Sequence, residues 1–238
     1  MLTFTPEERA HSFTVTVRVK GDGRGELISF EHGNRRNYTG KVTVNDNGTL
    51  TYDSPMKEDF TSRRALLNDD EWHDVTLTHF YARGETLLYV DNALAGSTSE
   101  VLLPWTFTIG DAKSTENKGF TMAELSFWRS GMNATEIKAH HEGSMLKSSL
   151  EIYSPMTFDV TADSDNKNLT VPNKAQSLNT ATCKLSESAA ITTVEADNDE
   201  SPACLYTVNG LSVKPSDAET GNIYIVRYSN GRVKKVAY

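Results

Sequence analysis

Apolar and polar residues alternate along most of the first half of the chain. In residues 13–20, FTVTVRVK, apolar side chains take every second position, at Phe13, Val15, Val17 and Val19. A period of two is typical of a β-strand with one face in the core and the other in water. The same pattern recurs at short spacing in residues 26–33, 40–54, 73–80, 86–97 and 105–111. The pattern therefore predicts an all-β protein.

Turn residues separate these runs. Asn47-Gly48 and Asp91-Asn92 each stand between two alternating stretches, where a tight antiparallel hairpin needs residues that accept a positive φ. Asn209-Gly210 and Asn230-Gly231 predict two further hairpins in the C-terminal segment.

One segment carries the signals of a helix. Residues 133–143, NATEIKAHHEG, begin with Asn133 as a candidate N-cap, and Glu136 follows at the spacing of a capping box. Gly143 stands where a helix end is expected. We expect a short helix that packs on a sheet edge.

The composition changes after about residue 160. Residues 159–190 contain few large apolar side chains, which is typical of loops or weak edge strands. We therefore place a domain boundary between residues 148 and 165. The prediction is a β-sandwich over residues 1–150 and a small C-terminal β module over residues 151–238.

The charge of the chain bears on its partners. Lys and Arg total 24 against 32 Asp and Glu, which gives a formal net charge of -8. Nucleic acids and anionic membranes are bound by clustered cations, so both are disfavoured, and a neutral ligand fits better. No apolar run approaches the roughly 20 residues of a membrane span, and the N-terminal residues lack a signal-peptide pattern. A chain can begin inside a longer protein, so this pattern does not indicate the cytoplasm.

The two cysteines, Cys183 and Cys204, both lie in the C-terminal third. An even pair is compatible with one disulfide, as in exported proteins, and equally with two free thiols. The sequence leaves both alternatives open.

Five short motifs occur in order over residues 72–137. They are Trp72-His73, Tyr89-Val90-Asp91, Ile109-Gly110, Glu124 with Phe127, and Glu136-Ile137. In this order they resemble the laminin G-like domains of the concanavalin A-like jelly-roll superfamily, over residues 4–147. The resemblance implies a jelly-roll sandwich. Asn92 replaces the usual Gly and the N-terminal part is short, so residues 149–156 are a candidate for completing the sandwich.

The C-terminal segment has a second resemblance. Residues 206–210, YTVNG, and residues 223–238, IYIVRYSNGRVKKVAY, look like the C-terminal sorting modules of bacterial proteins exported by type IX secretion. That likeness implies an exported bacterial protein, secreted or held at the cell surface.

The stretch around Trp72-His73 has a catalytic and a structural interpretation. In the first, His73 is a general base oriented by Asp74 or by the acids at 69–71. No Ser or Cys nucleophile stands in a recognisable strained turn. We therefore favour the second, in which Trp72 is buried and His73 caps a hairpin.

A jelly-roll glycosidase needs two or three carboxylates on one face of a strand. The strand expected to carry them has Glu124, but Ser126 stands two residues on and Arg129 at the fifth position. This pattern disfavours a glycoside hydrolase.

The candidate metal ligands are scattered. His140 and His141 are adjacent in a helix, so they point about 100° apart and are not placed to share an ion. Calcium is left open as a cofactor by the resemblance to lectins, and residues 21–26, 45–48 and 163–168 offer oxygen donors for it. No other cofactor is indicated.

Carbohydrate binding needs an exposed aromatic platform beside planar hydrogen-bonding groups. Aromatic side chains in or beside predicted loops are Trp105, Tyr38, Tyr52, Phe60 and Phe120, and the polar candidates near Tyr38 are Arg35, Arg36, Asn34 and Asn37. The leading hypothesis is a non-catalytic, lectin-like module that binds a polysaccharide or other glycan, with Trp105 tested first. The alternative is a structural or protein-adhesion domain without a sugar site.

Overall fold

The structure is a computed structural model, and it describes residues 1–33, 38–57, 59–110, 120–156 and 168–184, together with strands at 202–207, 212–213, 223–228 and 233–237. The chain divides into two compact units, Met1–Glu187 and Ser188–Tyr238. Every sheet formed by the described strands lies within one of these units.

In the described part of the first unit, one antiparallel sheet has eight strands. Their spatial order is β13 (Asn168–Val171), β14 (Ala181–Lys184), β1 (Leu2–Phe4), β10 (Pro104–Ile109), β3 (Gly25–His32), β4 (Tyr38–Val44), β5 (Leu50–Asp53) and β6 (Phe60–Thr61).

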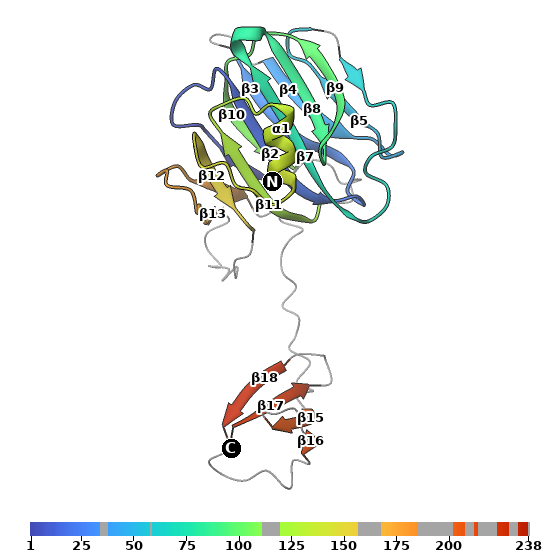
Figure 1. Cartoon of the computed structure of the whole chain (residues 1–238), viewed down its shortest axis with the longest axis vertical. Coiled ribbons are helices and arrows are strands. Elements are labelled where there is room, and N and C mark those ends of the chain that lie inside the picture. Colours follow the sequence, from blue (N-terminus) through green and yellow to red (C-terminus); the bar gives the residue numbers. More distant parts are fainter. Residues whose placement is uncertain are drawn as a thin grey trace. The chain divides into compact units, whose positions relative to one another are not determined.

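The second sheet has six antiparallel strands among the described residues. Their order is β12 (Leu150–Ser154), β11 (Met122–Trp128), β2 (Phe13–Lys20), β7 (Trp72–Phe80), β8 (Glu85–Val90) and β9 (Ala93–Ser99). The two sheets form the layers of a β-sandwich, as Figure 1 shows, so the predicted all-β architecture is confirmed.

The core between the sheets is built from the alternating apolar positions. Phe107 on β10 lies at its centre, with ring centroids 5.1 Å from Phe13 and from Phe127, 5.2 Å from Phe4 and 5.8 Å from Phe30. These five rings come from both sheets and are almost fully buried. Burial of large rings is the main stabilising contribution to such a core.

The polar face of β2 is buried at Thr14 and Thr16, contrary to the expectation of a solvated face, whereas Arg18 on the same face is exposed. Thr14 and Thr16 form hydroxyl pairs at 2.9 Å with Thr78 and Thr76 on β7. Cross-strand threonine pairs satisfy the hydroxyls out of water, and helix α1 (Ala134–His141) lies over this face in Figure 1. The outer face of β2 is therefore buried in its first half and exposed at Arg18.

Helix α1 has the predicted ends. The Asn133 side chain accepts hydrogen bonds from the backbone N–H groups of Thr135 and Glu136, and Glu136 bonds back to the Asn133 backbone, so the capping box is confirmed. Gly143 follows with φ +94°. The helix packs on the outer face of the six-stranded sheet through Ile137, beside Trp128. A short 3₁₀ helix, η1 (Tyr81–Arg83), joins β7 to β8.

Both predicted hairpins of the first unit are present. The turn between β4 and β5 is closed by a 2.8 Å hydrogen bond from the Asn45 N–H to the Thr49 carbonyl, and Gly48 has φ +77°. In the turn between β8 and β9 the positive φ, +57°, belongs to Asp91.

The first unit extends past residue 150, where the composition-based prediction ended the sandwich. Strand β12 pairs with β11, so the expectation that residues 149–156 add to the sandwich is confirmed. Strands β13 and β14 pair with each other, and β14 also pairs with β1. Among the described side chains of these two strands, Val171 and Ala181 lie in the core.

The second unit contains a small antiparallel sheet in the order β16 (Ser212–Val213), β15 (Pro202–Thr207), β17 (Ile223–Tyr228) and β18 (Val233–Ala237). The predicted C-terminal β module is therefore present, and the hairpin turns at 209–210 and 230–231 lie outside the described residues. Cys183 and Cys204 belong to different units, and a disulfide and two free thiols stay the two alternatives. Within the described ranges, no helix has the length and apolarity to cross a membrane.

Candidate functional site

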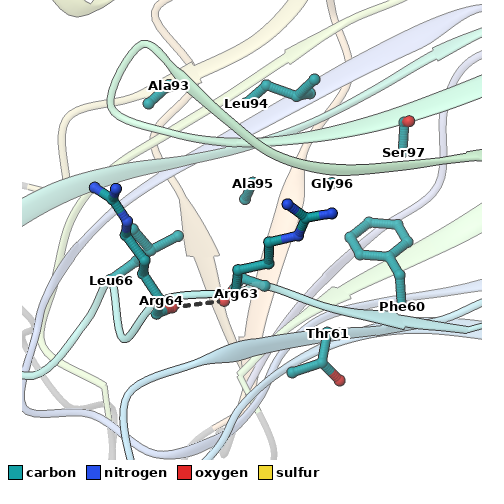
Figure 2. Close-up of a pocket in the computed structure, with 11 residues that line it drawn as sticks. Phe60, Thr61, Arg63, Arg64, Leu66, Ala93, Leu94, Ala95, Gly96 and Ser97 are labelled. Atoms are coloured by element: carbon teal, nitrogen blue, oxygen red, sulfur yellow. Dashed lines mark hydrogen bonds between the residues drawn. The ribbon is translucent and has the colours of Figure 1, made fainter.

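A groove lies where the edge strands β6 and β9 of the two sheets face each other. Residues 60–64 and Leu66 line one side, and residues 93–97 of β9 line the other (Figure 2). Its volume is 560 Å³, within the range of pockets that hold small ligands. The groove forms where β6, at the edge of one sheet, and β9, at the edge of the other, lie opposite each other.

The floor of the groove is apolar. Phe60 packs against the backbone of β9 at Gly96, where a Cβ atom would lie only 2.2 Å from the ring. On its other side the Phe60 ring lies 5.4 Å from the ring of Tyr52. Leu66 and the small residues of β9 complete the floor, and Leu94 is 55% exposed at the rim.

Two arginines supply the polar groups of the groove. Arg63 and Arg64 are exposed, and Figure 2 shows both side chains rising from the loop toward β9, with Arg63 beside the Phe60 ring. Within the described residues neither guanidinium has an ion-pair or hydrogen-bond partner. Their ten N–H donors, five on each guanidinium, are therefore free for a ligand.

The loop that carries the arginines is held in place by hydrogen bonds. Ser62 Oγ accepts from the Leu50 N–H at 3.0 Å and donates to the Arg64 carbonyl at 2.8 Å. The N–H groups of Leu66 and Leu67 both donate to the Gly48 carbonyl. The groove is thus formed before a ligand arrives.

A buried polar cluster supports the floor from within the sandwich. The Tyr52 hydroxyl donates to Glu100 Oε1 at 2.6 Å, and Ser54 Oγ donates to Glu100 Oε2 at 2.5 Å. Burial, together with the neighbouring Glu100 carboxylate, raises the pKa of Tyr52 well above its ordinary value. Tyr52 is fully buried, so its prediction as an exposed sugar platform is wrong.

The other predicted ligand residues lie elsewhere. Tyr38 is 45% exposed, and it shares an end of the eight-stranded sheet with the half-buried Trp105, because Tyr38 pairs with His32 and His32 pairs with Pro104. Phe120 is half-buried and packs on Gly23. Arg35 and Arg36, with their neighbours Asn34 and Asn37, lie outside the described residues. A ligand site at Trp105 and Tyr38 stays a prediction.

Sequence reasoning missed the two arginines of the groove. The available signal was their adjacency in FTSRRALL, shortly after Phe60, which is one of the predicted loop aromatics. Adjacent arginines alone do not identify a site, because nothing in the sequence places β9 opposite them.

The Trp72-His73 motif fixes a hairpin. His73 lies between two carboxylates, with Nε2 2.9 Å from Asp69 and Nδ1 3.1 Å from Asp91, and Asp91 also accepts from the Asp74 N–H at 3.1 Å. Burial lowers the pKa of His73, but its hydrogen bonds to both carboxylates outweigh burial and raise that pKa overall. The hydrogen bond from His73 lowers the pKa of Asp69. The predicted cap is confirmed.

Trp72 itself is 38% exposed, so the prediction that it is buried is wrong. Position 72 alternates with the inward positions of β7 and therefore faces outward. Helix α1 covers the outward residues further along β7. Trp72 is the first residue of β7 and is not covered by the helix.

The adjacent histidines of α1 contact different carboxylates, as their helical geometry predicted. His141 Nδ1 lies 2.7 Å from Asp74 Oδ2, whereas His140 Nε2 lies 3.8 Å from Glu124 and its ring meets Trp128 edge-on. Glu124 also accepts from Ser126 Oγ at 3.4 Å. These contacts tie the helix to the sheet.

One group among the described residues has the composition of a metal site. Asp74, Asp91 and His141 place ligand atoms within 4.8 Å of one another. An imidazole with two carboxylates suits zinc better than calcium, which prefers oxygen ligands only. Calcium stays a prediction: Asp22 and Asp46 line one 570 Å³ cavity together with residues 68–70, and most of the third candidate loop lies outside the described residues.

Comparisons with known proteins bear on the fold. No protein-family model matches the chain, and no curated protein matches it. The structure is similar to a candidate carbohydrate-binding protein from Bacteroides ovatus ATCC 8483, with a TM-score of 0.53 and 15% identity. The match covers 77% of this chain and 58% of that protein, so this chain spans less than two thirds of its length.

Two more distant similarities involve a heptameric SAP-like pentraxin from Limulus polyphemus and the CBM40 module of a Ruminococcus gnavus IT-sialidase bound to α2,3-sialyllactose. The pentraxin has a TM-score of 0.44 and 16% identity, over 59% of this chain and 74% of the other. The CBM40 module has a TM-score of 0.44 and 11% identity, over 56% of this chain and 84% of the other. The conclusion rests on the first similarity and on the topology. The chain is a jelly-roll β-sandwich with a small C-terminal β module.

Proposed function

We propose that the sandwich is a non-catalytic carbohydrate-binding module and that the β6–β9 groove is its binding site. The observation that carries the proposal is the combination of an apolar floor around Phe60 with two guanidinium groups on the rim that have no partner among the described residues. A sugar ring has an apolar C–H face and a rim of hydroxyls, and such a groove complements both. The fold is shared with a candidate carbohydrate-binding protein, which is consistent with this function.

The rigidity of the groove favours binding. Because hydrogen bonds hold the loop at Ser62, Leu66 and Leu67, little backbone entropy is lost when a ligand enters. Arginine is well suited to this task, since its planar fork bonds two ligand oxygens at once. Affinity would then be set by the contacts between the ligand and the groove, with little offset from ordering the loop.

The test is thermal melting of the whole chain against a panel of plant, algal and host glycans, with and without calcium. A glycan at 100 times its dissociation constant stabilises by about 2.7 kcal/mol, which is several degrees for a domain of this size. We expect a shift that is lost in Phe60→Ala and kept in Trp105→Ala. A shift lost only in Trp105→Ala would move the site to the Tyr38–Trp105 end, and no shift with any glycan would overturn the proposal.

The same samples test the absence of catalysis. We expect no release of reducing sugar from any bound polysaccharide. Hydrolysis that disappears in Glu124→Gln would identify a glycosidase instead.

One observation favours a second function, protein adhesion. Strand β9 is an edge strand of its sheet within the described residues, and Leu94 on it is 55% exposed. An edge strand can accept an extended peptide as an additional strand. A protein partner that protects the β9 amides from hydrogen exchange, in a chain that binds no glycan, would establish this function.

We also propose that the chain belongs to an exported, surface-located bacterial protein, with residues 188–238 acting as a sorting module. The proposal rests on the resemblance of residues 206–210 and 223–238 to type IX sorting modules and on the compactness of that segment by itself. Deleting residues 188–238 in a bacterium with type IX secretion is expected to retain the protein inside the cell and leave the sandwich folded. Normal export of the shortened chain would contradict it.

A further inference from the structure

We propose that the β6–β9 groove selects acidic glycans, and that Arg63 and Arg64 bind a carboxylate or sulfate group of the sugar. This inference rests on the proposed function and names its substrate class. It differs from the expectation for a neutral ligand that the net charge of -8 suggested, because selectivity is set by the charges that face the ligand and not by the sum over the chain.

The two groove arginines differ from three other described arginines, each of which contacts a carboxylate of the chain. Arg18 lies 3.9 Å from Asp74, and Arg83 and Arg129 form ion pairs with Glu85 at 3.0 Å and with Glu151 at 2.9 Å. Each of these charges is offset by a carboxylate of the chain itself. Within the described residues, no such carboxylate faces Arg63 or Arg64.

The lining of the groove contains no acidic residue among the described positions. The nearest described acid along the sequence, Asp59, accepts a hydrogen bond from the Ser54 N–H at 2.8 Å. The groove therefore has a local positive charge in a chain that is negative overall. We therefore expect the two arginines to pair with an anionic group of a bound ligand.

The surroundings of the guanidinium groups strengthen an interaction with an anion. Arg63 extends beside the Phe60 ring and Gly96, and Arg64 lies at the end of the groove with Leu66 (Figure 2). Apolar neighbours exclude water from a bound ligand, and a charge-assisted hydrogen bond is stronger there than in open solvent. Carboxylate and sulfate both present paired oxygens that match the guanidinium fork.

The experiment is an array of polysaccharides in which each acidic member stands beside its neutral counterpart. Polygalacturonate is paired with its methyl ester, and sulfated chondroitin and dextran with their unsulfated forms. We expect the whole chain to bind at least one acidic member about tenfold or more tightly than its neutral counterpart, because the neutral polysaccharide cannot form the charged hydrogen bond with the arginines. Added salt is expected to weaken that binding. The carboxylate and sulfate arms identify which anion is preferred.

The variant is Arg63→Gln with Arg64→Gln, which removes both charges and keeps side chains of similar length. We expect it to lose the acidic preference and to melt at the wild-type temperature, since both residues are exposed. The matched control is Arg83→Gln, which removes one exposed guanidinium outside the groove. We expect the control to keep the acidic preference.

The outcomes separate this inference from the proposed function. Equal binding of acidic and neutral members, unchanged in the double variant, would overturn the acidic selectivity and leave carbohydrate binding standing. An acidic preference that the double variant retains would overturn the role of the two arginines. Binding to no member of the array would overturn both proposals.

Discussion

His79 makes the sandwich sensitive to acid. It is fully buried on β7, where Nε2 accepts a hydrogen bond from the Leu102 N–H at 3.2 Å and Nδ1 lies 2.9 Å from Thr86 Oγ1. This arrangement requires the neutral ring with its proton on Nδ1, because a protonated Nε2 cannot accept. Burial lowers the pKa of His79 to about 4 from its ordinary 6.5.

The sign and size of the effect follow from linkage. Between pH 6.5 and 4 the unfolded chain binds a proton at His79 that the folded chain does not, so stability falls as the pH falls through this range. Lowering the pKa of His79 from 6.5 to about 4 corresponds to about 3 kcal/mol of stability, at about 1.36 kcal/mol per pH unit. Burial also lowers the pKa of His32 and acts in the same direction, whereas the raised pKa of His73 acts in the opposite direction. A comparison of variants is therefore required.

The perturbation is His79→Gln, which keeps an amide oxygen for the Leu102 N–H and cannot titrate. Urea unfolding is followed by tryptophan fluorescence from pH 7.5 to 4.5, because Trp72, Trp105 and Trp128 all lie in the first unit. We expect the wild-type protein to be more stable at pH 7.5, and its advantage to shrink by about 2 to 3 kcal/mol at the acid end. Parallel stability curves for the two proteins would refute the reasoning.

Three further predictions test packing and caps by thermal or urea unfolding. Asn133→Ala removes the capping box of α1 and is expected to cost about 1 kcal/mol, whereas Asn133→Asp is expected to retain the cap. His141→Ala removes the contact with Asp74 and is expected to cost about 1 kcal/mol; a variant as stable as the wild type would show that the contact is not formed in solution. Gly96→Val drives a side chain into Phe60, and we expect a loss of about 1 to 3 kcal/mol and weaker glycan binding; unchanged binding would contradict the groove assignment.

The strands of the first unit were predictable because their side chains must match a buried face. Alternation at residues 13–20 and 73–80 located β2 and β7, and Asn47-Gly48 located the turn between β4 and β5. The alternation could not show that Thr14 and Thr16 are buried, because helix α1 covers them from a distant part of the sequence.

Strands β13 and β14 were predicted as loop or weak edge strands. The sequence around them contains few large apolar residues and so carries almost no strand signal, and their place comes from the pairing of β14 with β1 and of β13 with β14. Tyr52 was mistaken for a loop aromatic, although it stands two residues from the inward Leu50 in the same alternating run. The period of that run was the signal that could have placed it in the core.

The groove could not be predicted from the sequence. Phe60 and Arg63 lie some thirty residues before Gly96, and they meet only because the two sheets close against each other at that edge. Local patterns report how one strand faces the core. They do not report which strand of the other sheet lies opposite.

The position of β1 in the sheet affects how the chain folds while it is being synthesised. Strand β1 lies between β10 and β14, so its two neighbours in the sheet come from the middle and the end of the first unit. During synthesis Leu2–Phe4 leave the ribosome long before either partner exists, and contacts of such long sequence separation form slowly. Until then the strand presents unpaired edges, which are prone to aggregate. In a nascent chain, β1 is therefore protected from aggregation only after β10 and β14 have been synthesised. A chain exported before residue 184 has been made would leave one edge of β1 unpaired.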